Sequence, residues 1–132
     1  MQEERKAFRT FENLEVYQVA REFRKAMYRV AGRLPDIEKF GLASQMRRAA
    51  VSLTNNIAEG HGRFHFQENI QYCRQARGSL DETRDHLIYI RDAKMVKDDN
   101  DLEYLIALCL KIKAKLNGYI AYLKKCKHGD NS

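Results

Sequence analysis

Apolar residues recur along four segments of the chain at alternating spacings of four and three positions. The first two stripes comprise Val16, Ala20, Phe23, Met27, Val30 and Leu34, and then Leu42, Met46, Ala49, Leu53 and Ile57. The last two comprise Phe66, Ile70, Cys73, Ala76, Leu80, Thr83, Leu87 and Ile90, and then Leu102, Leu105, Cys109, Ile112, Leu116, Tyr119 and Leu123. Such spacing places each stripe on one face of a helix. The pattern therefore predicts four amphipathic helices.

The limits of these segments coincide with residues that begin or end helices. Pro35 follows the first segment, and Gly60 and Gly62 follow the second. We expect one of these two glycines to end its helix in the left-handed conformation. Charges at the ends of the fourth segment complement the helix dipole. They are Asp98, Asp99 and Asp101 at the start, and Lys124, Lys125 and Lys127 at the end.

No alternating apolar and polar run is bounded by turn residues, so no sheet is predicted. Four long helices with short connections favour an all-α fold, an antiparallel up-down-up-down four-helix bundle. A chain of 132 residues suits one domain. We expect the bundle domain to span residues 11–127, with flexible segments at 1–10 and 128–132.

Composition favours an anionic partner. Lys and Arg total 24 against 18 Asp and Glu, a net charge of +6. No stretch approaches the roughly 20 apolar residues of a membrane span, and the N-terminal MQEERKAFRT has no apolar signal core. We therefore expect a cytoplasmic protein with no membrane partner. Three widely spaced cysteines suggest neither a disulfide framework nor a zinc ribbon, and Cys73 and Cys109 fall on apolar stripes.

The run SLTNNIAEGHGR at residues 52–63 has several interpretations. A phosphate-binding loop is disfavoured, because GHGR lacks the GxxxxGK[ST] spacing and no strand precedes it. His61 and His65 are four apart, as zinc ligands on one helix face would be, but Gly62 separates them and the Glu of HExxH is missing. Asn56 borders the apolar face, which favours a structural or assembly role.

Neither an enzyme nor a bound cofactor or metal is predicted. No nucleophile, general base and oxyanion donors can be combined from this sequence. The one group of residues that could form a buried polar cluster is Asn56 with Arg47 or Glu59. Any catalytic function is therefore a distant third hypothesis.

Basic residues form two groups, one on the third segment and one on the fourth. Arg77, Arg84 and Arg91 are spaced by seven, so they share one helix stripe, and Arg74 lies one turn from Arg77. This stripe can track a phosphate backbone, or it can pair with the nearby acids Asp81, Glu82 and Asp85. The fourth segment adds Lys111, Lys113, Lys115, Lys124, Lys125 and Lys127. Exposed aromatic residues could stack on bases, but we expect Tyr17, Tyr28, Tyr72, Tyr89 and Tyr104 to be core or interface residues.

From Phe11 to about Lys125 the chain resembles a bacterial four-helix-bundle family, the proteins encoded by intervening sequences of 23S ribosomal RNA genes. The resemblance is carried by FENLEVYQVA at 11–20, LPDIEKFGLASQMRRAAVSLTNNIAEGHGR at 34–63 and ARGSLDETRDHL at 76–87. Tyr17 stands where the family often has tryptophan. The resemblance implies a four-helix bundle assembled as a ring-like homopentamer. A distant relative in the family is a nucleic-acid-binding accessory protein of a reverse transcriptase.

Two functions follow as hypotheses. The first is a non-enzymatic, oligomeric protein that binds RNA or DNA through backbone charge. Its candidate contacts are Arg74, Arg77, Arg84, Arg91, Lys111, Lys115, Lys124 and Lys125. The second is a protein-interaction scaffold, which would expose an apolar or aromatic patch. For assembly, small residues in the second helix, including Ala43, Ala49 and Ala50, would allow close approach. The candidate assembly or structural motif is Arg47, Asn56, Glu59, Gly60 and Arg63.

Overall fold

A computed structural model describes residues 10–130 of the chain as a helical bundle. Its elements, in chain order, are η1 (Phe11–Asn13), α2 (Glu15–Gly32), η2 (Asp36–Glu38), α3 (Leu42–His61), α4 (Phe66–Asp92) and α5 (Asn100–Asp130). Within this described range there are no strands, so the all-α prediction and the four helical segments are confirmed. The flexibility expected for 1–9 and 131–132 concerns residues outside that range.

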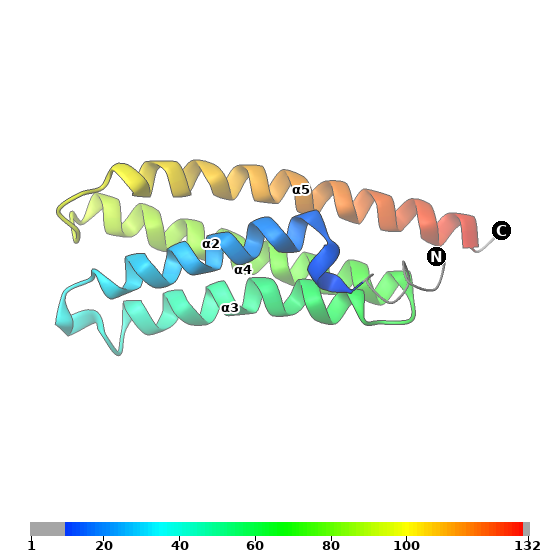
Figure 1. The fold of residues 1–132 in the computed structure, drawn as a ribbon, viewed down its shortest axis with the longest axis horizontal. Coiled ribbons are helices and arrows are strands. Elements are labelled where there is room, and N and C mark those ends of the chain that lie inside the picture. Colours follow the sequence, from blue (N-terminus) through cyan, green and yellow to red (C-terminus); the bar gives the residue numbers. More distant parts are fainter. Residues whose placement is uncertain (1–9, 131–132) are drawn as a thin grey trace.

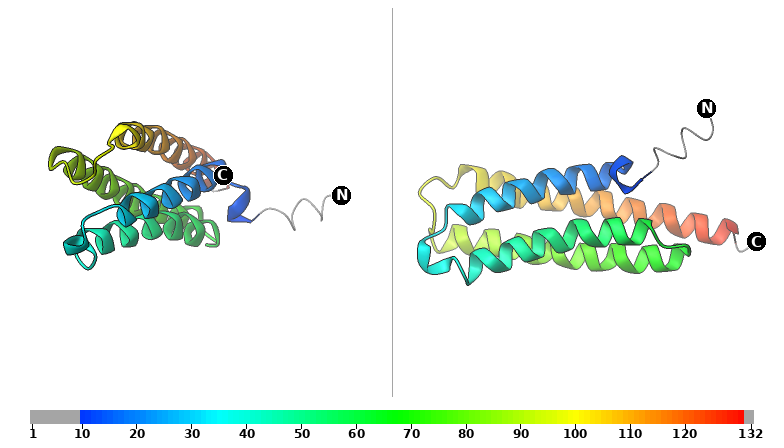
Figure 2. Two further views of the ribbon diagram at one scale, coloured as in Figure 1. Left: turned by 60° about the vertical axis from the view of Figure 1, so that its left-hand side comes forward. Right: turned by 60° about the horizontal axis from the view of Figure 1, so that its bottom comes forward.

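The four long helices lie side by side in an elongated bundle (Figures 1 and 2). The α2–α3 and α4–α5 connections lie at one end, and the α3–α4 connection lies at the other (Figure 1). Contacts between helices agree with this course, since residue numbers rise along one helix as they fall along the next. On α4 and α5, for example, Arg91 pairs with Glu103 and Asn69 pairs with Tyr119. The end with the α3–α4 connection therefore also holds η1 and the last turns of α5.

The core consists of the predicted apolar stripes. Nearly every stripe residue is buried, and only Leu42, Phe66 and Tyr119 are half-buried. The largest fully buried side chains include Phe23, Met27, Met46, Leu53, Leu80, Ile112 and Leu116. Each such side chain contributes about 1.5–3 kcal/mol relative to exposure, which greatly exceeds what surface pairs supply. Apolar burial along the stripes therefore drives formation of the bundle.

Gly60 and Gly62 do not act as predicted. No glycine in residues 10–130 has a positive φ, and Gly62 ends α3 at φ −79° and ψ −5°. Gly60 lies inside α3, buried against α4, where an added Cβ would come within 2.6 Å of Asn69 Oδ1 and 2.8 Å of Tyr72 Cβ. The prediction of a left-handed glycine cap is thus wrong, and Gly60 instead permits close packing of α3 on α4.

The left-handed residue in this fold is a lysine. Lys94 has φ 53° and follows the C-cap of α4. Met95 N donates to Ile90 O at 3.1 Å, and Lys94 N donates to Arg91 O at 3.1 Å. These two bonds form a Schellman motif, in which this position is usually glycine. The connection then reaches Asp98, whose Oδ1 accepts from Asn100 N at 3.1 Å as α5 begins.

Both predicted ends of the bundle domain shift slightly. Thr10 lies outside the expected bundle domain, yet it caps η1: its Oγ1 accepts from Glu12 N at 3.3 Å and its N donates to Asn13 Oδ1 at 3.0 Å. At the other end, α5 continues to Asp130, three residues beyond the expected limit of 127. The small residues predicted to serve assembly also differ, because Ala43, Ala49 and Ala50 are buried within this single chain.

Candidate nucleic-acid interface

The predicted arginine stripe on α4 turns toward α5. Arg77 Nη1 donates to Asn117 Oδ1 at 2.7 Å, and Arg84 Nε donates to the main-chain oxygen of Ile106 at 3.3 Å. Arg91 Nη1 donates to Glu103 Oε1 at 3.1 Å. The same seven-residue repeat that aligns a surface stripe also aligns residues along a helix–helix contact. These three arginines therefore cross-link α4 to α5.

Two of the three acids expected to pair with the arginines, Asp81 and Glu82, have other neighbours. Asp81 accepts from Lys113 Nζ at 3.2 Å, and Glu82 lies 3.7 Å from His86 Nε2. Arg91 pairs with Glu103 and with the adjacent Asp92, at 3.1 Å each. Hydrogen bonds to these two carboxylates raise the pKa of Arg91 above its ordinary value. Its charge is thus already balanced by acids of this chain.

Several lysines of α5 are also bound within the chain. Lys115 Nζ donates to Glu15 Oε1 on α2, and this bond and the lysine charge lower the pKa of Glu15. Lys127 Nζ donates to Gln67 Oε1 at 2.7 Å. These contacts join α5 to α2 and α4. Lys115 is therefore a weaker candidate for phosphate contact than the sequence suggested.

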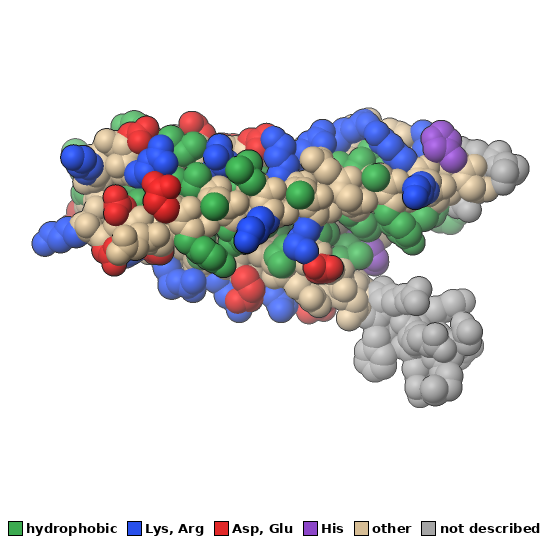
Figure 3. All heavy atoms as spheres, turned by 90° about the horizontal axis from the view of Figure 1, so that it is seen from above, with side chains coloured by type: hydrophobic (Ala, Val, Ile, Leu, Met, Phe, Trp, Pro, Cys, Tyr) green, Lys and Arg blue, Asp and Glu red, His purple; other side chains and the backbone are tan. Residues whose placement is uncertain are grey.

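Four of the eight predicted contacts remain exposed without a hydrogen-bond or ion-pair partner in residues 10–130. They are Arg74, Lys111, Lys124 and Lys125. No Asp or Glu occurs between Tyr104 and Gly129. Figure 3 looks onto the α5 side, where Lys and Arg side chains gather over the half nearer the C terminus. We call Lys124, Lys125 and Lys127 the lysine end of α5.

The candidate assembly motif divides into two separate groups. Arg47 packs on the ring of Tyr28 at 5.8 Å. At the far end of α3, Arg63 Nη2 pairs with Glu59 Oε2 at 3.3 Å, and its guanidinium lies 4.8 Å from the ring centre of Tyr72. Arg63 Nη2 also donates to Tyr72 Oη at 2.5 Å, and the contacts with Tyr72 and Glu59 raise the pKa of Arg63. Gly60 is the packing residue described above.

Asn56 satisfies its amide within its own helix. Its Nδ2 donates to the main-chain oxygen of Ser52 at 2.8 Å and to Ser52 Oγ at 3.1 Å. Ser52 Oγ also shares a 2.8 Å hydrogen bond with Ser79 Oγ of α4. The side chain is half-buried and bonds to neither Arg47 nor Glu59. The buried polar cluster considered from the sequence is therefore not formed, and Asn56 supports the α3–α4 contact through Ser52.

His61 and His65 do not share one helix face. His61 is the last residue of α3, and His65 is the N-cap of α4. Throughout residues 10–130, no three His, Cys, Asp or Glu side chains are grouped as ligands for a metal ion. In the same range no helix combines the length and apolarity needed to cross a membrane.

The tyrosines divide between core and surface. Tyr17 is buried and contacts Phe11 edge-on, with ring centres 4.8 Å apart. Tyr28, Tyr89 and Tyr104 are 44%, 54% and 65% exposed, so these three lie outside the core of this chain, and an interface position for them stays a prediction. Exposed aromatic rings therefore occur on several helices.

Comparison with known families identifies the chain. The family model for the 23S rRNA-intervening sequence protein matches residues 12–118. The chain belongs to this family. The match covers most of the bundle, from η1 into the second half of α5, and it includes all but the first residue of the three sequence blocks that carry the resemblance. The lysine end lies beyond the matched residues. No curated protein matches the chain.

Proposed function

We propose that this member of the 23S rRNA-intervening sequence protein family is a non-enzymatic nucleic-acid-binding protein of the cytoplasm. The observation that carries the proposal is the unpaired basic surface of α5. Lys111, Lys124 and Lys125 are exposed, and no carboxylate of α5 lies between residues 104 and 129 to neutralise them. Contacts of this kind recognise phosphates and not base sequence.

The spacing of these lysines suits an extended polyanion. Lys111 and Lys125 are fourteen residues apart, so they lie on the same side of α5, about 21 Å apart at 1.5 Å per helical residue. Phosphates follow one another at about 3.4 Å along the axis of a duplex strand, so this length corresponds to roughly six phosphates. Arg77, Arg84 and Arg91 hold α5 against α4 in this proposal and make no phosphate contact.

We further propose that the subunit is an up-down-up-down bundle and that it assembles into a ring-like homopentamer. Repetition of a +6 chain around a ring would place several lysine ends on one assembly. Many weak phosphate contacts then act together, which raises overall affinity without any new contact. Light scattering tests the assembly, and a monomer at working concentrations would exclude it.

The test of binding is titration of labelled structured RNA and duplex DNA at low and at physiological salt. We expect affinity to fall steeply with salt, with a slope of about −0.9 per phosphate contact on duplex DNA. The double variant Lys124→Glu, Lys125→Glu should flatten this slope. The matched control is the double variant Lys39→Glu, Lys97→Glu, which changes the net charge equally at the opposite end of the bundle. It should retain the steep salt dependence of the wild-type protein. Absence of binding even at low salt would contradict the proposal.

A second candidate function is a protein-interaction scaffold. Ile37 and Phe40, around η2, are each 89% exposed. Large apolar side chains exposed this fully are typical of contact surfaces. This candidate predicts little salt-sensitive nucleic-acid binding, so the same titration distinguishes the two.

A further inference from the structure

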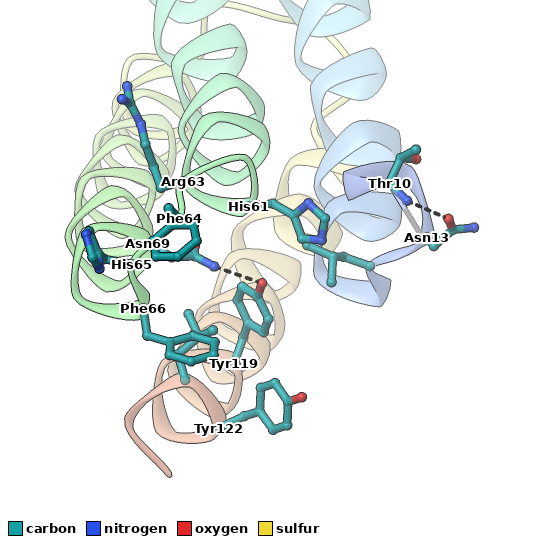
Figure 4. Close-up of a pocket in the computed structure, with 12 residues that line it drawn as sticks. Thr10, Asn13, His61, Arg63, Phe64, His65, Phe66, Asn69, Tyr119 and Tyr122 are labelled. Atoms are coloured by element: carbon teal, nitrogen blue, oxygen red, sulfur yellow. Dashed lines mark hydrogen bonds between the residues drawn. The ribbon is translucent and has the colours of Figure 1, made fainter. Parts of the chain in front are cut away.

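A cavity of about 420 Å³ opens beside the lysine end. It is lined from η1, from the α3–α4 connection and from the last turns of α5 (Figure 4). Its volume lies within the range of small-molecule sites in proteins, about 300–1,000 Å³. It is distinct from the phosphate-binding surface argued above, because no lysine lines it and four aromatic residues do, namely Phe64, Phe66, Tyr119 and Tyr122.

Two exposed aromatic residues line this cavity. Phe64, in the α3–α4 connection, is 91% exposed, and Tyr122 of α5 is 60% exposed. Tyr122 stacks on Tyr119, with ring centres 6.3 Å apart and planes at 15°. In Figure 4 Phe64 and Tyr122 lie on different sides of the opening. A flat aromatic ligand could contact either ring without moving the backbone.

Polar groups at the base of the cavity are held in place by the fold. Asn69 is buried, and its Nδ2 donates to Tyr119 Oη at 3.2 Å. Because this oxygen acts as acceptor, the hydroxyl hydrogen of Tyr119 remains to donate to a ligand. Burial raises the pKa of Tyr119, so the hydroxyl keeps its proton. The imidazole of His61 also points toward the cavity (Figure 4).

The surrounding charge favours an anionic molecule. No Asp or Glu lines the cavity. Arg63 lies at its edge, but the guanidinium is turned to Glu59 and Tyr72. Lys125 follows Tyr122 by three residues and so occupies the same helix face one turn further on. A chain of phosphates on the lysine end would therefore pass close to the cavity.

We propose that this cavity takes an unpaired base of a nucleic acid whose phosphates lie on the lysine end. This inference rests on the proposed function and adds to it a preference for single-stranded ends or loops. Stacking on Phe64 and Tyr122 would provide most of the affinity for the base itself, as aromatic rings do in single-strand binding proteins. The Tyr119 hydroxyl and His61 would donate to or accept from the edge of the base.

The experiment compares two RNA hairpins that carry the same 3′ overhang, one with bases and one abasic. Both overhangs bear the same phosphates, so any difference in affinity measures the bases. We expect the wild-type protein to bind the overhang with bases about tenfold more tightly. Phe64→Ala and Tyr122→Ala should each remove most of this preference. Phe40→Ala and Tyr104→Ala, equally exposed aromatic residues elsewhere, are matched controls that should retain it.

The outcomes separate this inference from the proposed function. Equal, salt-dependent affinity for both hairpins would overturn the base pocket and leave phosphate binding intact. Loss of preference in Phe40→Ala or Tyr104→Ala as well would also overturn it, since the effect would not belong to the cavity. Absence of binding to either hairpin would overturn both proposals. Lys124→Glu, Lys125→Glu should weaken both hairpins to the same extent if the division of roles is correct.

Discussion

Gly60 of α3 lies directly against Asn69 of α4, with no room for a side chain between them. An ideal Cβ at Gly60 would lie 2.6 Å from Asn69 Oδ1 and 3.2 Å from the main-chain oxygen of Asn69. Backbone oxygen cannot move aside as the end of a flexible side chain can. The close approach of the two helices at this level therefore depends on glycine.

Replacing Gly60 by alanine should destabilise the protein. Alanine improves helix propensity by about 1 kcal/mol, but overpacking in a tight contact costs about 1–3 kcal/mol, so the net change is unfavourable. Chemical denaturation measures it. Gly78→Ala and Gly118→Ala are the controls, because neither added Cβ meets an atom within 4 Å and both glycines are exposed within helices. They should raise the denaturation midpoint, and a rise for Gly60→Ala would contradict the packing argument.

Lys94→Gly should stabilise the chain. A residue with a Cβ pays about 1–2 kcal/mol in the left-handed conformation that Lys94 adopts at φ 53°, and glycine does not. Part of that gain is lost to the greater freedom of glycine in the unfolded chain. We therefore expect a gain of about 0.5–1 kcal/mol in the free energy of unfolding. Lys97→Gly removes the same charge from the same connection and should give no gain.

Arg84 and Arg74 should separate structural from binding roles. Arg84→Met removes the bond to Ile106 O and should cost about 1 kcal/mol of stability while leaving RNA affinity within about twofold. Arg74→Met should leave stability unchanged and weaken RNA binding, because Arg74 is exposed without a partner in the described part of the chain. Thermal denaturation and RNA titration on both variants provide the comparison. The reverse pattern would return Arg84 to the phosphate-binding surface.

Thiol labelling should distinguish Cys126 from the other two cysteines. Burial raises the pKa of Cys73 to about 11 and that of Cys109 to about 12. The thiolate is the reactive form, so both thiols should resist alkylation of the folded protein at pH 8. Cys126 is half-buried near the end of α5. Mass spectrometry after a short reaction should find one label on the folded chain and three on the unfolded chain, whereas early labelling of Cys109 would indicate opening of the core.

The four long helices could be predicted from the sequence because buried apolar residues recur at helical spacing along each of them. Phe23, Leu53, Leu80 and Ile112 each belong to a stripe whose spacing has no other explanation than a helix. Helix ends were harder to predict. Gly60 looks like a helix terminator when only its neighbours in sequence are considered. Its contact with Asn69 depends on the four-residue connection 62–65, whose geometry the sequence does not reveal.

The site was predicted less completely. A repeat of seven aligns Arg77, Arg84 and Arg91 whether they face solvent or an adjacent helix, so spacing could not choose between the two. The cavity beside the lysine end combines Phe64 with Tyr122, which are 58 positions apart in the chain. Phe64 has a signal in the sequence, the run FHF at 64–66 directly after Arg63, but nothing near Tyr122 marks it as a partner of Phe64.

The contact of Gly60 with Asn69 also constrains how relatives of this chain can diverge. Asn69 both fills the space left by Gly60 and donates to Tyr119, so the crossing of α3 and α4 and the base of the cavity share one side chain. A larger residue at position 60 would meet both the side chain and the main-chain oxygen of Asn69, so it requires α3 and α4 to separate, and that movement would also displace the donor to Tyr119. Substitutions at positions 60, 69 and 119 are therefore coupled, and we expect relatives to retain all three residues or to exchange them together.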